Sequence, residues 1–383
     1  MQTRILGQYL LPNLRSIRWH VSSWDIIPFL RLFLNPGLID VEIDFPSNDS
    51  HVYRSVTVSL IPTKALTHLR LGFVSVNDPL YMDALCNLLD EASATLTSIG
   101  SLGQPSMAVI KKLLQLPNLR LLDVQLPETR ISPPPVVFPS LEKLFVGYTE
   151  GRTWLHILRN IPNPALREFG VIFWGTSPTY LQTLGTSLLD ANIHRTLTSF
   201  KGICLETIPL TEAGVRPFLS FERLTNLELP SYCLDERCGF QLNDSIICEL
   251  AAALPQLTNV ELGDIPYKTC TSDVTITSLV AFSTNCVDLD CLRLHFDAKD
   301  IIFRGTYANS QPRRFTCKLR TLVVGSLPLP SNHDDILFVA FTILHIFPHL
   351  ETISSAGQGW NQVGRAVELF QKAPRAIPVL ITN

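Results

Sequence analysis

Charged residues are scarce in this sequence, and neither sign is in clear excess. They make up 17% of the 383 residues, where about a quarter is typical, and the formal net charge is -3. A surface that binds nucleic acid needs a basic stripe to neutralise phosphates. We therefore expect no nucleic-acid partner. Hydrophobic residues, at 46%, indicate an ordered chain with ample material for a core.

The sequence also has no hydrophobic run of the roughly 20 residues that a membrane-spanning helix needs. Its longest run, residues 336–347, is much shorter and includes His345. We predict a buried helix there and no membrane partner. Residues 1–11 contain no apolar stretch of the kind that secretory signals carry. We therefore expect a cytoplasmic or nuclear location.

Cysteine pairs with a complete zinc-ligand spacing are missing. The nine cysteines are an odd number scattered along the chain, which indicates reduced thiols. Cys233/Cys238 and Cys286/Cys291 each have the spacing of half a zinc site, but neither has a second pair close by. We predict no metal site and no cofactor.

Sequence motifs for catalysis are absent as well. The chain has no phosphate-binding loop, dinucleotide-binding turn, nucleophile elbow or zinc-protease helix motif. His333, Asp334 and Asp335 could form an acid/base group. At the predicted start of a helix they are better interpreted as capping residues and partners of the helix dipole. We predict that the protein is not an enzyme and has no catalytic residues.

One short phrase recurs along the whole chain: an apolar residue, two variable residues, an apolar residue, one variable residue and usually a third apolar residue. Clear copies are LPNLRLLDV (116–124), FPSLEKLFV (138–146) and LPQLTNVEL (254–262). The 336 residues between the first and last anchor contain twelve intervals, so the mean spacing is 28. Such a period is typical of leucine-rich repeats that carry a helix. The anchors are Leu14, Leu38, Leu66, Leu96, Leu119, Leu141, Leu166, Leu197, Leu224, Leu257, Leu289, Leu319 and Leu350.

The alternating part of each phrase predicts a strand whose apolar side chains point into a shared core. Helix-start signals lie between the phrases, where a capping residue satisfies free amide donors. We therefore predict an α/β leucine-rich-repeat solenoid, a horseshoe with parallel strands on the concave face and helices on the convex face. The helix-start signals are Asn77-Asp78-Pro79, Ser177-Pro178, Asn243-Asp244 and Asp334-Asp335.

The repeats run almost from end to end, so we predict a single solenoid over residues 1–383 with about thirteen repeats. The proline-rich segment 127–139 is a possible local irregularity. We interpret it as a connection without a helix inside one solenoid; the alternative is a true hinge.

The phrases LLPNLRSIRW (10–19), FPSLEKL (138–144) and LPNLRLLDV (116–124) resemble the repeat region of F-box leucine-rich-repeat proteins of mushroom-forming fungi. The resemblance implies a protein–protein interaction module similar to the substrate-recognition part of a ubiquitin-ligase adaptor. In that family an F-box precedes the repeats and binds a Skp-type adaptor and thereby a cullin. Here the first repeat begins by Leu11, so we expect the repeat region only, with the F-box absent. Skp-type and cullin partners are expected only if an F-box exists upstream.

Two other functions stay open. One is a stand-alone leucine-rich-repeat scaffold with no ligase role, which binds a protein partner of unknown identity. The other, less favoured, is a leucine-rich GTPase activator of the RanGAP type. Such activators have a similar architecture but usually end in an acidic tail, whereas this chain ends RAVELFQKAPRAIPVLITN.

Partner binding is expected on the outward positions of the strands, which neighbouring repeats place side by side. Each such residue could instead be merely the solvated side of the sheet. The acidic residues at positions 40, 42 and 44 could pair with arginines of the adjacent strands. An outward aromatic is a stronger anchor candidate. The predicted contact residues are Arg18, His20, Asp40, Glu42, Asp44, His68, Arg70, Lys143, Phe145, Glu228, Glu261, Arg293 and His295.

Overall fold

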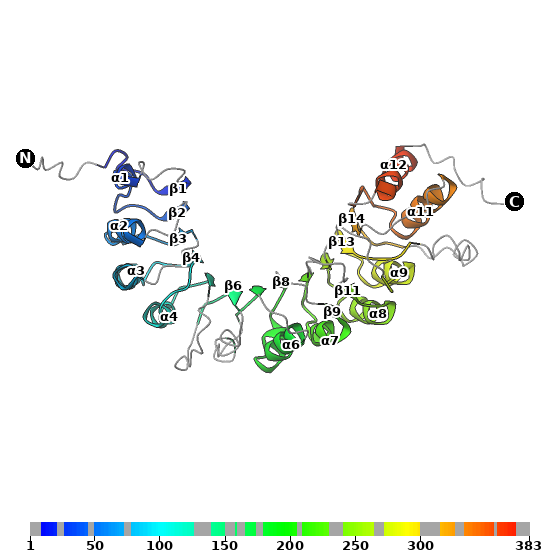
Figure 1. Cartoon of the computed structure of the whole chain (residues 1–383), viewed down its shortest axis with the longest axis horizontal. Coiled ribbons are helices and arrows are strands. Elements are labelled where there is room, and N and C mark those ends of the chain that lie inside the picture. The colour runs from blue at the N-terminus through cyan, green and yellow to red at the C-terminus, as the bar shows by residue number, and fades with distance from the viewer. Residues whose placement is uncertain are drawn as a thin grey trace, which may run out of the picture. The chain divides into compact units, whose positions relative to one another are not determined.

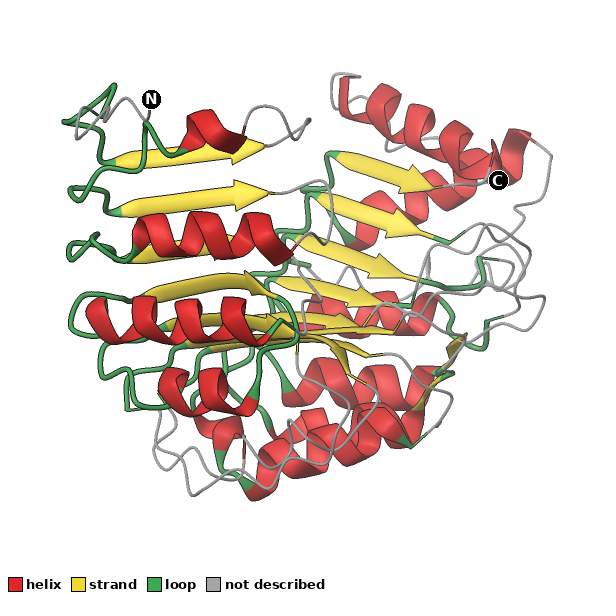
Figure 2. Cartoon of the chain, turned by 60° about the vertical axis from the view of Figure 1, so that its left-hand side comes forward, coloured by secondary structure: helices red, strands yellow, loops and turns green. Residues whose placement is uncertain are grey.

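The computed structural model describes residues 9–20, 27–44, 50–72, 78–125, 139–149, 158, 165–173, 179–204, 209–229, 240–263, 272–298, 315–325, 333–355 and 358–372. The chain forms two compact units, Met1–Phe173 and Trp174–Asn383. Within each unit, parallel strands form a sheet and the helices lie against one of its faces (Figure 1, Figure 2).

In the described part of the first unit, seven strands pair in chain order, each parallel to the next. They are β1 (Ser16–His20), β2 (Asp40–Asp44), β3 (His68–Leu71), β4 (Ser98–Leu102), β5 (Leu121–Gln125), β6 (Lys143–Thr149) and β7 (Glu168–Phe173). The helices in the described part of this unit are α1 (Ile27–Leu30), α2 (Ser50–Leu60), α3 (Pro79–Glu91) and α4 (Met107–Leu113).

The described part of the second unit repeats this arrangement with a sheet of six parallel strands. Its strands are, in order, β8 (Ser199–Cys204), β10 (Asn226–Leu229), β12 (Asn259–Leu262), β13 (Cys291–Leu294), β14 (Thr321–Val324) and β15 (Thr352–Ser355). Two short strands, β9 (Leu210–Thr211) and β11 (Phe240–Gln241), pair separately. The helices are α6 (Tyr180–Asp190), η2 (Ile193–Arg195), α7 (Glu212–Val215), η3 (Arg216–Ser220), α8 (Asp244–Ala253), α9 (Ile276–Asn285), α11 (His333–Ile346) and α12 (Gln358–Lys372).

Every strand of the two sheets begins two residues after one of the predicted anchor leucines. Thus β3 begins at His68 after Leu66, and β10 begins at Asn226 after Leu224. Twelve of the thirteen anchors are buried, and only Leu14 in the first repeat is partly exposed. The core of each unit therefore lies between the sheet and the helices.

A row of threonines holds successive repeats in register. In several repeats the threonine next to the anchor donates its hydroxyl to a carbonyl oxygen of the preceding repeat. The donors are Thr67 to Ile39 (3.1 Å), Thr97 to Thr67 (3.1 Å), Thr225 to Thr198 (3.0 Å) and Thr258 to Thr225 (3.0 Å). The same carbonyl oxygens also accept backbone N–H groups, so the hydroxyls add to a ladder that already pairs the strands.

Two of the helix-start signals cap their helices as predicted. Asp78 caps α3 by accepting a hydrogen bond from Leu80 N at 2.9 Å, with Pro79 as the first helical residue. Asn243 caps α8 in the same way through Ile246 N at 3.2 Å. Ser177 and Pro178 lie outside the described residues, and α6 follows at Tyr180.

The apolar run 336–347 forms most of α11, whose first turn contains Asp334 and Asp335. Its inward side chains are buried, as predicted, including Val339 and Ile343 at 0% exposed. No helix in the described part of the chain is long and apolar enough to cross a membrane.

The cysteines that the structure describes with their side chains are free thiols. Burial raises the pKa of Cys286 to about 12, so this thiol stays protonated. Its Sγ lies 3.5 Å from Leu254 O, and Cys317 Sγ lies 3.3 Å from Cys286 O. Both cysteines are therefore packing residues of the core, and Cys233 and Cys238 lie outside the described residues.

The observed architecture is an α/β leucine-rich-repeat solenoid, with parallel strands on one face and helices on the other. Thirteen strands in the described regions match the thirteen predicted anchors. One continuous solenoid over residues 1–383 stays a prediction. The proline-rich segment falls almost wholly on residues 126–138, which lie outside the described residues.

Candidate functional site

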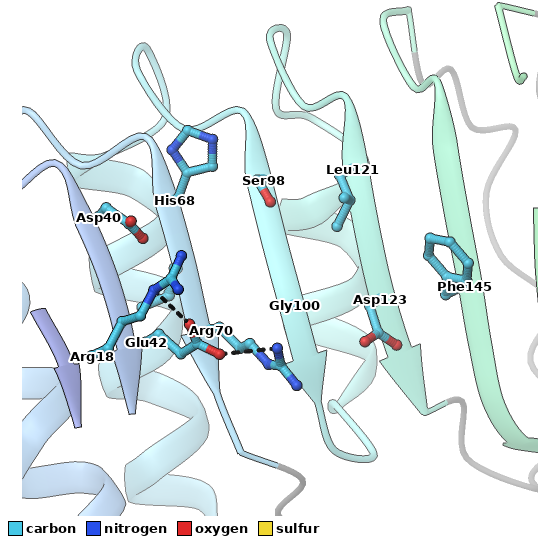
Figure 3. A pocket seen from close by; sticks show the side chains of 11 residues that line it. Arg18, Asp40, Glu42, His68, Arg70, Ser98, Gly100, Leu121, Asp123 and Phe145 are labelled. Atoms are coloured by element: carbon cyan, nitrogen blue, oxygen red, sulfur yellow. Dashed lines mark hydrogen bonds and ion pairs between the residues drawn. The ribbon is translucent and has the colours of Figure 1, made fainter. Parts of the chain in front are cut away.

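The helices leave one face of the first unit's sheet uncovered, and we call it the open face. A shallow hollow of about 510 Å³ lies on it, formed by outward side chains of six adjacent strands (Figure 3). A second hollow of about 370 Å³ shares His68, Ser98 and Leu121 with the first. The first is lined by Arg18, Asp40, Glu42, His68, Leu69, Arg70, Ser98, Gly100, Leu121, Asp123 and Phe145.

Glu42 joins two arginines across three strands. Its Oε2 lies 3.2 Å from Arg18 Nε and its Oε1 lies 3.0 Å from Arg70 Nη1. The three residues share one register position on β1, β2 and β3, and Figure 3 shows both contacts as dashed lines. Glu42 is only 19% exposed, against 72% for Arg18 and 51% for Arg70. The carboxylate is thus covered by the two guanidinium groups, which themselves face solvent.

The other two acidic residues of β2 are also engaged. Asp44 Oδ2 lies 2.8 Å from His20 Nδ1 on β1. Asp40 accepts a hydrogen bond from the Ser16 hydroxyl at 3.1 Å and lies opposite His68 in the register of β2 and β3. The acidic strand therefore pairs with its neighbours, which is the charge-pairing alternative that the sequence left open.

A β-bulge in β4 connects Arg70 to Asp123. Gly100 and Ser101 together oppose the single residue Asp123, because the register shifts between Ile99 and Leu102. Ser101 has a φ of 55°, in the left-handed region. Its hydroxyl accepts a hydrogen bond from Arg70 Nε at 3.1 Å, and its backbone N–H donates to Asp123 Oδ2 at 3.3 Å. Bulges of this kind redirect side chains on a sheet.

Asp123 is partly buried on the open face. Burial raises the pKa of its carboxyl, and hydrogen bonds from the backbone and the hydroxyl of Ser101 and the charge of Arg70 oppose that rise. The net direction is upward, because these two partners do not replace all the water that the carboxylate has lost.

Phe145 lies beside Asp123 on the adjacent strand, where the two residues are register partners. On its other side Phe145 opposes Gly170 of β7, and one edge of the ring occupies the place where a side chain at position 170 would begin. Lys143, two residues earlier on β6, pairs with Glu168 of β7 at 2.6 Å.

The second unit carries a comparable row on its own uncovered sheet face. Lys201 of β8 pairs with Glu228 of β10 at 2.5 Å, and Arg293 of β13 forms an ion pair with Glu261 of β12. Glu228 and Glu261 are register partners. Burial raises the pKa of Glu261, and Glu228 adds to the rise while Arg293 opposes it.

His295 corrects the sequence prediction, which placed it on the outward side. Its side chain is only 2% exposed. The strand β13 ends at Leu294, so the alternation of inward and outward side chains stops there, and His295 and Phe296 both turn inward. The imidazole fills the place that a side chain at Gly325 would need and lies 5.6 Å from the ring of Phe240. His295 is a core residue and not part of a contact surface.

Six of the predicted residues line the first hollow and Lys143 lines the second, whereas His20 and Asp44 pair with each other and line neither. Three others, Glu228, Glu261 and Arg293, lie together in the second unit's row. Sequence reasoning did not assign Gly100 or Ser101 to the contact surface, and it placed Asp123 at an outward position without including it among the predicted contact residues. The outward register position of Asp123 was a usable signal, whereas no sequence pattern marks the bulge. In the described residues, no group of three or more His, Cys, Asp or Glu side chains could hold a metal ion.

No family model matches the chain, and no curated protein matches it. Among solved structures, the chain is similar to a leucine-rich-repeat protein of Leptospira interrogans with 13% identity and a TM-score of 0.34. That match covers 91% of this chain and 73% of the other.

Proposed function

We propose that this chain is a protein–protein interaction module that holds a partner protein on the open face of its first unit and acts in the cytoplasm or nucleus. The supporting observation is the hollow itself, in which charged side chains, a serine and an aromatic ring from six adjacent strands converge on one surface. In this proposal the chain binds and does not catalyse.

The composition of the hollow suits a protein partner. Arginine and aromatic side chains contribute most of the binding energy at protein interfaces, and Arg18, Arg70 and Phe145 line this surface. Glu42 holds both guanidinium groups in place before a partner arrives. Side chains that are already ordered lose less conformational entropy on binding, so this arrangement favours affinity.

A steric block tests the proposal. Gly100 forms part of the hollow, and a Cβ there would meet only the flexible side chain of Arg70 at 3.4 Å. Gly100→Tyr should therefore fill the hollow without unfolding the sheet. The matched control is Glu91→Tyr, on an exposed position at the end of α3 on the helix side.

The measurement is proximity labelling with the full chain fused to a biotin ligase. We expect a discrete set of proteins that the wild type and Glu91→Tyr both label and that Gly100→Tyr no longer labels. If all three proteins label the same set, with equal melting temperatures, the open face does not bind the partner.

We further propose that the bound protein is a substrate for ubiquitylation, which the resemblance to F-box leucine-rich-repeat proteins supports. Co-purification of a Skp-type adaptor and a cullin with the expressed protein is the expected result. If partners are labelled but neither ligase component co-purifies, the chain acts as a stand-alone scaffold.

A further inference from the structure

Asp123 differs from Glu42, the other acidic residue of the hollow whose contacts involve Arg70, in what its carboxylate meets. The carboxylate of Glu42 is shared by two arginines, whereas in the described part of the chain Asp123 has no ion pair within 4.0 Å. Asp123 accepts a hydrogen bond from the backbone N–H of Ser101, and the Ser101 hydroxyl and the charge of Arg70 also stabilise its carboxylate, but burial outweighs these contacts. A partly buried carboxylate whose lost hydration is only partly compensated favours the approach of a cation.

The surroundings of Asp123 are apolar on the side away from Arg70. Phe145 is its register partner on β6, and Leu121 lies two residues earlier on β5, where both line the hollow (Figure 3). Because one edge of the Phe145 ring lies over Gly170, the ring is tilted toward β7. Gly100, on the opposite side, has no side chain to cover the carboxylate.

We propose that Asp123 and Phe145 form the docking point for a lysine or arginine side chain of the partner protein. The charged group would meet the Asp123 carboxylate, and the methylene groups and the cation would lie against the Phe145 ring. This inference rests on the proposed function, since it names the chemistry that the open face recognises.

The charged side chains around the first unit's hollow favour a cation over an anion at Asp123. An incoming carboxylate would face Asp123 and Glu42, and the nearest cation, Arg70, is already shared between Glu42 and Ser101. Burial raises the pKa of Asp123, because it disfavours the charged carboxylate. A docked cation would offset this free-energy cost. Charge complementarity therefore selects a basic side chain.

Panning a phage-displayed library of random dodecapeptides on the immobilised full chain tests the inference. The wild type should enrich peptides that contain lysine or arginine relative to the input library, and Asp123→Asn should lose this enrichment. The asparagine keeps an oxygen that accepts the Ser101 N–H, so the variant should fold. Glu91→Gln, which removes one negative charge from the helix side, is the matched control and should enrich the same peptides as the wild type.

The best-enriched peptide is then synthesised with its basic residue intact or replaced by methionine. On the wild type the replacement should weaken binding about tenfold, and on Asp123→Asn it should have little further effect. Phe145→Leu should weaken binding of the intact peptide about threefold through loss of the aromatic face, even if Asp123→Asn were to fold poorly.

The inference is overturned if the wild type enriches no basic residues. It is also overturned if replacing the basic residue of the peptide weakens binding by the same factor on the wild type and on Asp123→Asn. In that case the proposed function still stands as long as Gly100→Tyr abolishes proximity labelling of the partner. Loss of the labelling difference would instead overturn the function itself.

Discussion

One edge of the Phe145 ring lies over the backbone of Gly170, in the place where a side chain would begin. Gly100 is a contrasting case on the same sheet face, since a Cβ there would meet Arg70 Cγ at an ordinary distance of 3.4 Å. The two glycines therefore have different roles: Gly170 receives an aromatic ring, and Gly100 leaves the hollow open.

Gly170→Ala should destabilise the first unit by about 1 kcal/mol, because the added methyl group forces Phe145 out of its preferred rotamer. Gly100→Ala should be neutral or slightly stabilising, since alanine restricts the unfolded chain and meets no rigid neighbour. Urea unfolding monitored by circular dichroism compares the two. Adding Phe145→Ala should abolish the effect of Gly170→Ala; an additive double variant would mean that the ring contact is not its cause.

Asp123→Asn should change how stability depends on pH. The pKa of Asp123 is raised in the folded state, so this residue contributes full stability below its ordinary value of 3.8 and loses that contribution as pH rises through the raised value. The unfolding free energy of Asp123→Asn relative to the wild type should therefore increase between about pH 4 and neutral pH. Glu91→Gln is the control with an exposed carboxylate. A difference that stays constant or falls with pH would contradict the burial of Asp123.

Leu227→Asp should lower the unfolding free energy by roughly 4 kcal/mol, because it places a carboxylate in a core position that is 0% exposed. The neighbouring Glu228→Ala should change it by less than about 1 kcal/mol. The lost ion pair with Lys201 is partly exposed, and its removal also relieves repulsion with Glu261. Chemical denaturation of both variants measures the contrast; equal losses would mean that the strand register is wrong.

Asp244→Ala should lower the free energy of unfolding by about 2 to 3 kcal/mol, although Asp244 lies near the surface. Its carboxylate accepts hydrogen bonds from Thr275 N at 2.8 Å, Thr275 Oγ1 at 2.6 Å and Ser278 Oγ at 2.6 Å. These contacts tie α8 to the start of α9 in the next repeat, and bonds to a charged acceptor are among the stronger ones. Asp290→Ala, at a carboxylate that is 62% exposed, is the control and should leave the melting temperature nearly unchanged in thermal unfolding.

The repeat frame could be predicted from the sequence in detail. Every strand of the two main sheets begins two residues after a predicted anchor, and Asp78 and Asn243 cap the helices that follow them. Both features depend on short stretches of chain. Alternation along a strand and capping at a helix start are decided by residues within about four positions of one another. The local sequence pattern was therefore sufficient to predict the strands and these two helix starts.

The candidate site could be predicted only in part. The outward positions were identified correctly for Glu42, Arg70 and Phe145. The sequence did not reveal which of these side chains pair with neighbours in the sheet and which can contact a partner. Glu42 meets its two arginines across gaps of 24 and 28 residues, so the pairing depends on how neighbouring repeats stack.

The sequence determined the repeat phase, the core leucines and the fold class, because these follow from local periodicity. The tertiary structure alone decided the bulge at Ser101, the inward turn of His295 and the tilt of Phe145 over Gly170. One extra residue in a strand, or the end of a strand, shifts the alternation of side chains at that point. A glycine on the adjacent strand, more than twenty residues away, decides which way a ring can lean. Such contacts join residues of different repeats, so they cannot be predicted from the sequence of one repeat alone.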